Sequence, residues 1–226
     1  INIYIYIILY VICYIYTIYY KLYIINYIFA IQLKMTSTLL NNLSNITHNG
    51  YLTLILGPMF AGKTTYLLKE IEKYETIYSK NKILVINHMS DNRYANNKIS
   101  SHDKKMYPCL KKNKLNDITS RELEGKEIIV IDEGQFFTDI DEMVRTFIND
   151  NNLKIIVGGL NGTFQQKKFD TSNILNLIPF ADNVIHLKSK CYKCGMEASF
   201  SKRIINDNQE ILVGNNNYQP CCRKCL

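Results

Sequence analysis

One segment organises the sequence and reads Leu52-Thr53-Leu54-Ile55-Leu56-Gly57-Pro58-Met59-Phe60-Ala61-Gly62-Lys63-Thr64-Thr65. Its first five residues are mostly apolar and predict a buried strand, which ends at Gly57. Residues 57–64 match the pattern G-x-x-x-x-G-K-[ST], and residues 66–71 continue with the apolar spacing of a helix. A strand, a glycine-containing loop and a helix in this order are typical of the loop that binds nucleotide phosphates.

Each part of this loop has a physical role. Backbone N–H groups of the loop and of the helix N-terminus attract phosphate oxygens, and Gly57 and Gly62 allow the main chain to approach closely. Lys63 would reach the outer phosphates, and the Thr64 hydroxyl would ligate Mg²⁺. A chance match in an ordinary strand–helix turn is the alternative. The residues expected to bind ATP here are Gly57, Pro58, Met59, Phe60, Ala61, Gly62, Lys63 and Thr64.

A pair of carboxylates follows another predicted strand. Residues 127–131 include four consecutive apolar residues and lead directly into Asp132-Glu133-Gly134-Gln135. An acidic residue at the end of such a strand holds Mg²⁺ in nucleotide-binding enzymes, and we expect this of Asp132. Glu133 is then free to accept a proton from an attacking hydroxyl or water, and Gly134 and Gln135 complete the phosphate-side segment. Such pairs occur in ATPases as well as in kinases, and a solvated strand end is the remaining alternative.

Further apolar runs predict the fold class. Runs of strand length alternate with helical patterns, at 83–86, 154–159 and 184–187 for the strands and at 66–78, 139–149 and 171–180 for the helices. This alternation predicts an α/β fold, a P-loop NTPase-like parallel sheet with helices on both faces. Residues 95–122 give no clear prediction, and their lysines are interpreted as a solvated face.

Ligands of such a sheet bind at the carboxyl ends of its strands. The loop that leaves the strand at 83–86 contains Asp91, Asn92 and Arg93, which are candidates for the phosphate–magnesium region. A merely solvated loop is an equally good interpretation of these three residues.

The amino-terminal stretch differs from the rest in composition. Ile and Tyr make up 21 of residues 1–33, and Lys21 is the only charged residue before Lys34. The run begins with Ile1 and has the bias of translated AT-rich non-coding sequence, whereas Met35 opens an ordinary polar start. We therefore expect residues 1–34 to be an extension outside the mature fold. A membrane anchor or an uncleaved signal is the alternative.

The carboxyl-terminal residues carry a metal-binding pattern. Five of the seven cysteines lie in the last 36 residues, including two C-x-x-C pairs that are separated by 27 residues. This spacing predicts a structural zinc site with four cysteine ligands, in a reducing compartment. Cys221 could replace Cys222, although the C-x-x-C register favours Cys222. The predicted ligands are Cys191, Cys194, Cys222 and Cys225.

A hairpin is predicted between the two cysteine pairs, from residues 199–205 and 209–213. The predicted domains are thus the extension at 1–34, a nucleotide-binding α/β domain at 50–187 and a zinc-binding domain at 188–226. The net charge of +7 weakly suits anionic ligands and does not by itself indicate nucleic acid.

Together these motifs resemble the type II thymidine kinases of eukaryotic cytosol, bacteria and poxviruses. The resemblance rests on the loop 57–64, Asp91-Asn92-Arg93-Tyr94, residues 131–137, Leu160-Asn161-Gly162-Thr163-Phe164-Gln165 and the four cysteines, and it extends from Gly50 to Cys225. Two positions depart from it, because Ala61 stands where many members carry Ser and Asn161 where many carry Asp. The second change leaves substrate preference slightly open.

The resemblance implies transfer of the γ-phosphoryl group of ATP to the 5′-hydroxyl of thymidine, with Glu133 as general base. Lys63 and Mg²⁺ would stabilise charge on the phosphates. The loop at about 209–213, here called the lasso loop, would close over the nucleoside and read the base through its main chain. The implied substrate-binding residues are Met59, Phe136, Leu160, Phe164, Gln209, Glu210, Ile211, Leu212, Val213 and Tyr218.

The resemblance also implies a cytoplasmic homotetramer that is inhibited by dTTP and binds neither nucleic acid nor membrane. Three other functions remain open from the residues alone: a P-loop ATPase with a zinc ribbon that acts on nucleic acid, a kinase for another deoxynucleoside, and a non-enzymatic zinc-binding scaffold. The intact Lys63, Thr64, Asp132 and Glu133 argue against the scaffold.

Overall fold

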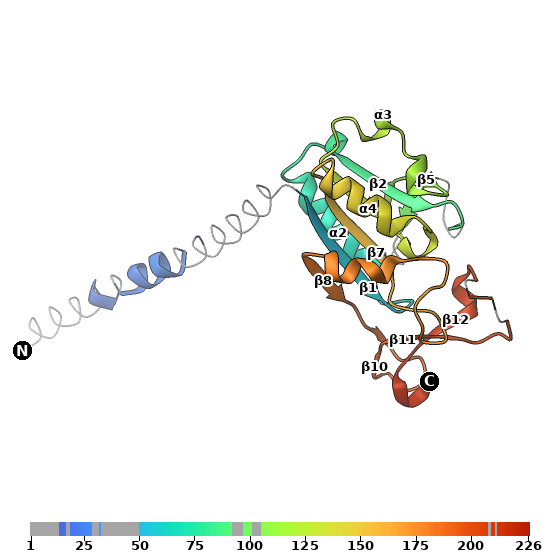
Figure 1. Cartoon of the computed structure of the whole chain (residues 1–226). Helices are drawn as coiled ribbons and strands as arrows, with labels where there is room; N and C mark the ends of the chain where they lie inside the picture. Colours follow the sequence, from blue (N-terminus) through green and yellow to red (C-terminus); the bar gives the residue numbers. More distant parts are fainter. Residues whose placement is uncertain are drawn as a thin grey trace, which may run out of the picture. The chain divides into compact units, whose positions relative to one another are not determined.

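The computed structural model describes residues 14–16, 19–28, 32, 50–91, 97–100, 105–207, 209–210 and 212–226 (Figure 1). The chain divides into two units, residues 1–48 and 49–226. In the first unit, residues 19–28 are helical and their side chains are exposed. Among the described residues, no helix is both long and apolar enough to cross a membrane. The predicted boundaries at residues 34, 50 and 187 stay predictions.

A parallel sheet of six strands forms the centre of the second unit, as the alternation of strands and helices predicts. Its order is β5-β2-β6-β7-β1-β8. The strands are β1 (Tyr51–Gly57), β2 (Ile83–His88), β5 (Leu110–Lys112), β6 (Ile128–Ile131), β7 (Lys154–Leu160) and β8 (Asn183–His186).

The two faces of this sheet are covered by different helices (Figure 1). Helix α2 (Lys63–Glu75) packs on one face, where Leu67 and Ile71 meet Ile55 of β1. Helix α4 (Ile140–Asn149) packs on the other face, where Val144 and Phe147 join a separate cluster. Strand β1 supplies both clusters because successive side chains of a strand point to opposite faces. The predicted α/β class is therefore confirmed.

The structure corrects two helix predictions. Helix α2 begins at Lys63 and not at Tyr66, because Gly62 adopts the left-handed conformation (φ 81°) that lets the chain turn directly into the helix. Residues 171–173 are not helical, and the segment Ile174–Phe180 is a 3₁₀ helix. The 3₁₀ segments are Lys80–Lys82, Leu115–Asp117, Gly134–Phe136, Ile174–Phe180, Asn215–Asn217 and Arg223–Cys225.

Residues 97–123 contain more structure than the sequence predicts. Strand β5 forms one edge of the central sheet, and β3 (Lys98–Ser100) pairs antiparallel with β4 (Met106–Pro108). Helix α3 (Ser120–Leu123) begins at a Thr119 cap whose side chain accepts a hydrogen bond from the Glu122 backbone. These elements are too short for a clear apolar period, which explains why the pattern did not predict them.

The hairpin predicted from residues 199–205 and 209–213 is wrong. Strand β11 (Phe200–Arg203) pairs with β12 (Tyr218–Cys221), and β9 (Ser189–Lys190) pairs with β10 (Glu197–Ala198). The lasso loop therefore belongs to the connection between two paired strands, and its described residues form no strand. Pairing of β11 with β12 brings the second cysteine pair back to the first.

We expect Phe147→Ala to destabilise the second unit by about 3–5 kcal/mol, since the ring is 2% exposed at the α4 face of the sheet. Urea unfolding of the full chain, followed by far-UV circular dichroism, measures this loss. Ile77→Ala serves as the control, because Ile77 is 44% exposed and its truncation should stay within about 0.5 kcal/mol. Equal losses in the two variants would contradict the assigned core.

Candidate active site and metal centre

The candidate site lies at the carboxyl edge of the sheet, where β1, β6 and β7 end. The register pairs Gly57 with Leu160 and Ile131 with Val157. The loop 57–64 leaves β1 at this edge, and Asp132 and Glu133 leave β6 beside it. The parallel ladder thus collects segments that are far apart in the sequence.

The loop 57–64 is tightly turned. Phe60 has a positive φ of 63°, and the backbone N–H of Tyr66 donates to Gly62 O at 2.9 Å to start the helix. A Cβ atom on Gly57 would lie 2.6 Å from the Leu187 carbonyl oxygen, so only glycine fits there. Lys63 lies along the loop and donates to the carbonyl oxygens of Gly57 (3.2 Å) and Pro58 (2.9 Å).

Two predicted magnesium ligands are in direct contact. Thr64 Oγ1 donates to Asp132 Oδ2 at 2.9 Å across 68 residues of sequence. Asp132 is 2% exposed, and its other oxygen accepts the backbone N–H of Glu133 at 3.0 Å. A hydroxyl and a carboxylate held together are oxygen ligands of the kind that Mg²⁺ takes, so these residues fit the ion.

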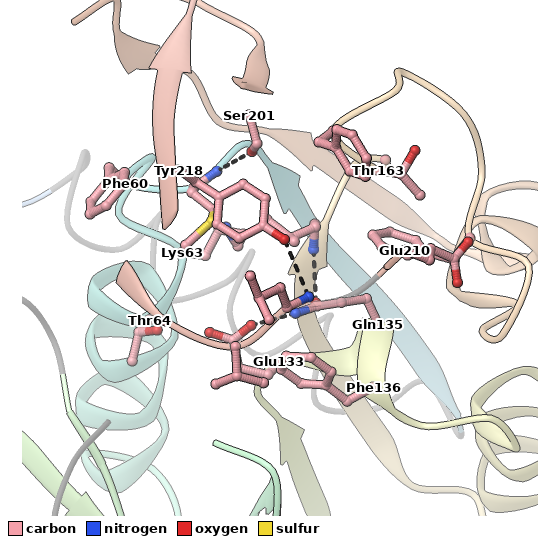
Figure 2. A pocket seen from close by; sticks show the side chains of 18 of the residues that line it. Phe60, Lys63, Thr64, Glu133, Gln135, Phe136, Thr163, Ser201, Glu210 and Tyr218 are labelled. Carbon is pink, nitrogen blue, oxygen red and sulfur yellow. Dashed lines mark hydrogen bonds between the residues drawn. The ribbon is translucent and has the colours of Figure 1, made fainter. Parts of the chain in front are cut away.

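The Glu133 carboxylate is held in one orientation. Its backbone adopts the left-handed conformation (φ 55°), which is uncommon for a residue with a side chain. Gln135 Nε2 donates to Glu133 Oε2 at 2.5 Å, and Gln135 Oε1 accepts the backbone N–H of Leu160 at 3.0 Å (Figure 2). Gln135 thereby ties the carboxylate to the end of β7. This positioning contact was not predicted from the sequence.

A cavity of about 360 Å³ lies between the loop 57–64, the carboxylate segment and the C-terminal residues (Figure 2). It brings together most of the predicted substrate-binding and phosphate-binding side chains. Its lining includes Met59, Phe60, Gly62, Lys63, Thr64, Glu133, Gln135, Phe136, Leu160, Phe164, Glu210, Leu212, Val213 and Tyr218.

Other predicted residues are not part of this lining. Asp91 is 5% exposed and accepts from Asn87 Nδ2 at 2.9 Å, while Lys111 Nζ donates to its carbonyl oxygen at 2.8 Å. Gln209 does not line the cavity, and its carbonyl oxygen accepts from Arg203 NH1. The candidates Asn92, Arg93 and Ile211 lie outside the described residues.

The cavity is also lined by residues that the motifs did not identify, among them Phe169 and Ser201. Ser201 Oγ accepts the backbone N–H of Met59 at 2.9 Å (Figure 2), and Ser189 Oγ donates to Phe60 O at 3.1 Å. These serines attach the C-terminal residues to the loop 57–64. A serine in a short strand carries no recognisable pattern, so only the structure identifies them.

His88 supports the aromatic wall of the site from behind. Its ring lies 5.6 Å from that of Phe136 and 4.9 Å from that of Phe137, between centroids. Burial lowers the pKa of His88 below its ordinary value. Nδ1 accepts the backbone N–H of Ser90 at 3.1 Å, so the neutral ring carries its proton on Nε2, which donates to Asn113 O at 3.0 Å. The histidine packs as a neutral ring.

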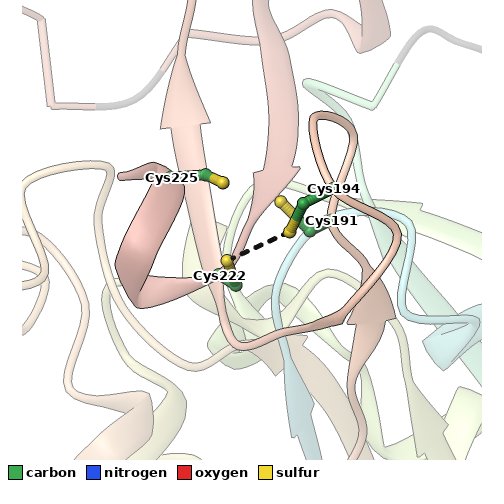
Figure 3. A group of neighbouring side chains, drawn as sticks. All are labelled: Cys191, Cys194, Cys222 and Cys225. Atoms are coloured by element: carbon green, nitrogen blue, oxygen red, sulfur yellow. Dashed lines mark hydrogen bonds between the residues drawn. The ribbon is translucent and has the colours of Figure 1, made fainter.

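The four cysteines of the two C-x-x-C pairs form one cluster (Figure 3). Their Sγ atoms all lie within 4.8 Å of one another, and those of Cys194 and Cys222 are 3.6 Å apart. Four sulfurs around zinc at about 2.3 Å would be separated by about 3.8 Å. The cluster is therefore the right size to hold a metal, consistent with structural zinc.

Two thiols of the cluster, those of Cys191 and Cys225, differ in acidity. Backbone N–H groups, that of Cys222 foremost and then that of Cys194, lower the pKa of Cys191 to about 6. The neighbouring Cys194 thiol raises the pKa of Cys225 to about 12. Cys191 therefore loses its proton more readily than Cys225 does. Cys221 lies outside the cluster, is 4% exposed, and has a pKa raised by burial.

The parallel α/β sheet carries a glycine-containing loop with Lys63 and strand-end carboxylates beside one cavity. These features are typical of nucleotide-dependent enzymes that transfer or hydrolyse a phosphoryl group. Comparison with known proteins gives the family. The family model for thymidine kinase matches residues 50–226. A thymidine kinase of vaccinia virus (strain Ankara) is 42% identical over 179 residues, which are 79% of this chain and 97% of the viral protein. The thymidine kinases of monkeypox virus and variola virus are 41% identical over the same shares.

The chain therefore belongs to the thymidine kinase family. The resemblance inferred from the motifs is confirmed. An ATPase acting on nucleic acid, the first of the alternative functions, is not favoured by these relatives.

We expect Cys222→Ser to lose zinc and Cys221→Ser to retain it, although the two residues are adjacent in the sequence. Only Cys222 contributes a sulfur to the cluster, whereas Cys221 packs beside it. Metal analysis of the purified full-length chains measures the zinc content of each variant. Loss of zinc from Cys221→Ser with retention by Cys222→Ser would show that the assigned ligand set is wrong.

Proposed function

We propose that this chain phosphorylates thymidine by transferring the γ-phosphoryl group of ATP to the 5′-hydroxyl, with Glu133 as the general base. The observation that carries this proposal is the buried carboxylate of Glu133, which faces the same cavity as Lys63 and Thr64 (Figure 2). A carboxylate within reach of a bound hydroxyl can accept its proton as the phosphoryl group is transferred.

The phosphates of ATP would bind to the loop 57–64. Its backbone N–H groups and the N-terminus of α2 favour negative charge, and Lys63 would exchange its carbonyl contacts for phosphate oxygens. Thr64 and Asp132 would hold Mg²⁺, which supplies charge neutralisation on the phosphates when it is bound. Asp91, Asn92 and Arg93 are proposed to lie on the phosphate side. Gly134 and Gln135 would keep Glu133 oriented.

Thymidine would occupy the apolar part of the cavity. Aromatic and aliphatic walls suit a flat pyrimidine, because ring faces stack and apolar side chains exclude water. Main-chain groups of the lasso loop would read the base edge. The proposed walls are Met59, Phe136, Leu160, Phe164, Leu212, Val213 and Tyr218, with Gln209, Glu210 and Ile211 in the lasso loop.

The wider biological context is also a proposal. Zinc at the four cysteines would be structural, since four protein ligands leave no open position. We infer a cytoplasmic homotetramer that is inhibited by dTTP and acts without nucleic acid or membrane. The family membership supports these features.

The proposal is tested by measuring phosphate transfer from ATP and Mg²⁺ to thymidine, deoxycytidine, deoxyadenosine and deoxyguanosine in parallel. We expect thymidine to be the preferred acceptor. Preference for another nucleoside would support the proposed mechanism but would show that the proposed substrate is wrong. Transfer to none of them, together with ATP hydrolysis stimulated by DNA, would contradict the proposal.

We expect Glu133→Gln to lower kcat by about 10²–10⁴-fold while ATP binding stays near that of the wild type. The amide keeps the shape of the side chain and its contact with Gln135, but it cannot accept a proton. Steady-state kinetics and ATP titration measure the two effects. Glu142→Gln is the control, because Glu142 is exposed on α4. Unchanged kcat in Glu133→Gln would remove Glu133 from the proposed role.

A further inference from the structure

Arg203 is a buried cation at the end of β11. Its side chain is 2% exposed. The Asp207 carboxylate lies 3.6 Å from NH1, but the Asp207 side chain is 29% exposed. Burying a charge is costly unless hydrogen bonds compensate it. The contacts of the Arg203 guanidinium therefore indicate which parts of the protein it stabilises.

Four of the five N–H groups of the Arg203 guanidinium donate hydrogen bonds to the lasso loop or to residues close to it in the sequence. NH1 donates to Asp207 O at 2.9 Å and to Gln209 O. NH2 donates to Glu210 O at 3.3 Å and to the Tyr218 hydroxyl. Within the described residues, Nε has no hydrogen-bond partner. One planar group thus holds three carbonyl oxygens of a loop that belongs to no helix or strand.

The same guanidinium contacts two aromatic walls of the cavity. Its central carbon lies 3.9 Å from the centroid of the Phe164 ring and 5.0 Å from that of the Tyr218 ring. Both rings line the cavity, whereas Arg203 itself does not. A guanidinium plane stacks on an aromatic face and fixes it. Arg203 therefore supports these walls from behind.

Two further contacts join this arrangement to the rest of the site. The Tyr218 hydroxyl also accepts the backbone N–H of Leu212 at 3.3 Å. The Glu210 carboxylate accepts the backbone N–H of Asp170 at 2.5 Å and the Thr171 hydroxyl at 2.9 Å. The lasso loop is thus tied by its carbonyls to Arg203 and by a side chain to the loop before Ile174.

We propose that Arg203 is a positioning residue for the nucleoside: it sets the lasso loop and the Phe164 and Tyr218 rings in the arrangement that receives the base. The inference rests on the proposed binding of thymidine in this cavity. It assigns Arg203 no contact with ATP or with the transferred phosphoryl group, because its partners all lie on the nucleoside side. A change at Arg203 therefore acts on one substrate.

Lysine cannot replace arginine here. Its ammonium has three donors and no plane, so it cannot reach three carbonyls and the phenol while stacking on Phe164. Arg203→Lys keeps the positive charge and removes only this geometry. It is therefore a sharper test than a neutral replacement, and Arg203→Met provides the larger perturbation.

Arg223 offers a matched control on the outer surface. Its guanidinium lies 4.7 Å from the centroid of Phe200, which is also on β11, but Arg223 is exposed and neither residue lines the cavity. Arg223→Met thus removes a similar arginine–phenylalanine stack from the same strand. We expect its kinetics to match those of the wild type.

The experiment measures kcat, KM for thymidine and KM for ATP in the full chain and its variants, together with the temperature of unfolding. We expect Arg203→Lys to raise the KM for thymidine about 10- to 100-fold, with the KM for ATP within about twofold. Arg203→Met should raise the KM for thymidine further. A general loss of stability would affect both KM values, so a change in the KM for thymidine alone points to a role in positioning the nucleoside.

An unchanged KM for thymidine in Arg203→Lys would overturn the inference. So would equal increases of both KM values with a lowered unfolding temperature, because Arg203 would then be supporting the whole fold. Wild-type protein that does not phosphorylate thymidine would overturn the proposed function itself, and this inference with it. Measuring thymidine phosphorylation by the wild type thus distinguishes failure of the proposed function from failure of the inference about Arg203.

Discussion

The parallel hydrogen-bond ladder that joins β6, β7 and β1 is the constraint on which the site depends. Because neighbouring parallel strands are held in register, their carboxyl ends meet at one edge. This places Thr64 against Asp132 across 68 residues of sequence and leaves Glu133 beside them. The apolar clusters on both faces stabilise the ladder, so packing far from the cavity determines the distances within it.

The C-terminal residues are part of the site and more than an appendage to it. Ser201 and Ser189 bind the backbone of Met59 and Phe60, while Arg203 holds the lasso loop. The four cysteines bring the two ends of this segment together, and few apolar residues are available there to form a core. A metal at the cysteines would therefore influence both the phosphate side and the nucleoside side.

Two residues at the cavity adopt left-handed backbone conformations although they carry side chains, Phe60 and Glu133. Such conformations cost about 1–3 kcal/mol each and persist only where the surroundings impose them. At Phe60 the loop is bound by two serines, and at Glu133 the carboxylate is bound by Gln135. The strain is located where the chain turns from a strand into the residues that face the substrate.

The sequence by itself determined the α/β class, the loop 57–64, the carboxylate pair and the four cysteines, because each depends on local spacing. It did not predict the pairing of β11 with β12, the edge strand β5, or the positions of Ser201 and Arg203. It singled out Gln135 but not the contact of Gln135 with Glu133. Those features arise from contacts between residues distant in the chain, which no local pattern records. Arg203 shows this most clearly: in the sequence it is one of many basic residues, and only tertiary packing makes it a buried support for the cavity wall.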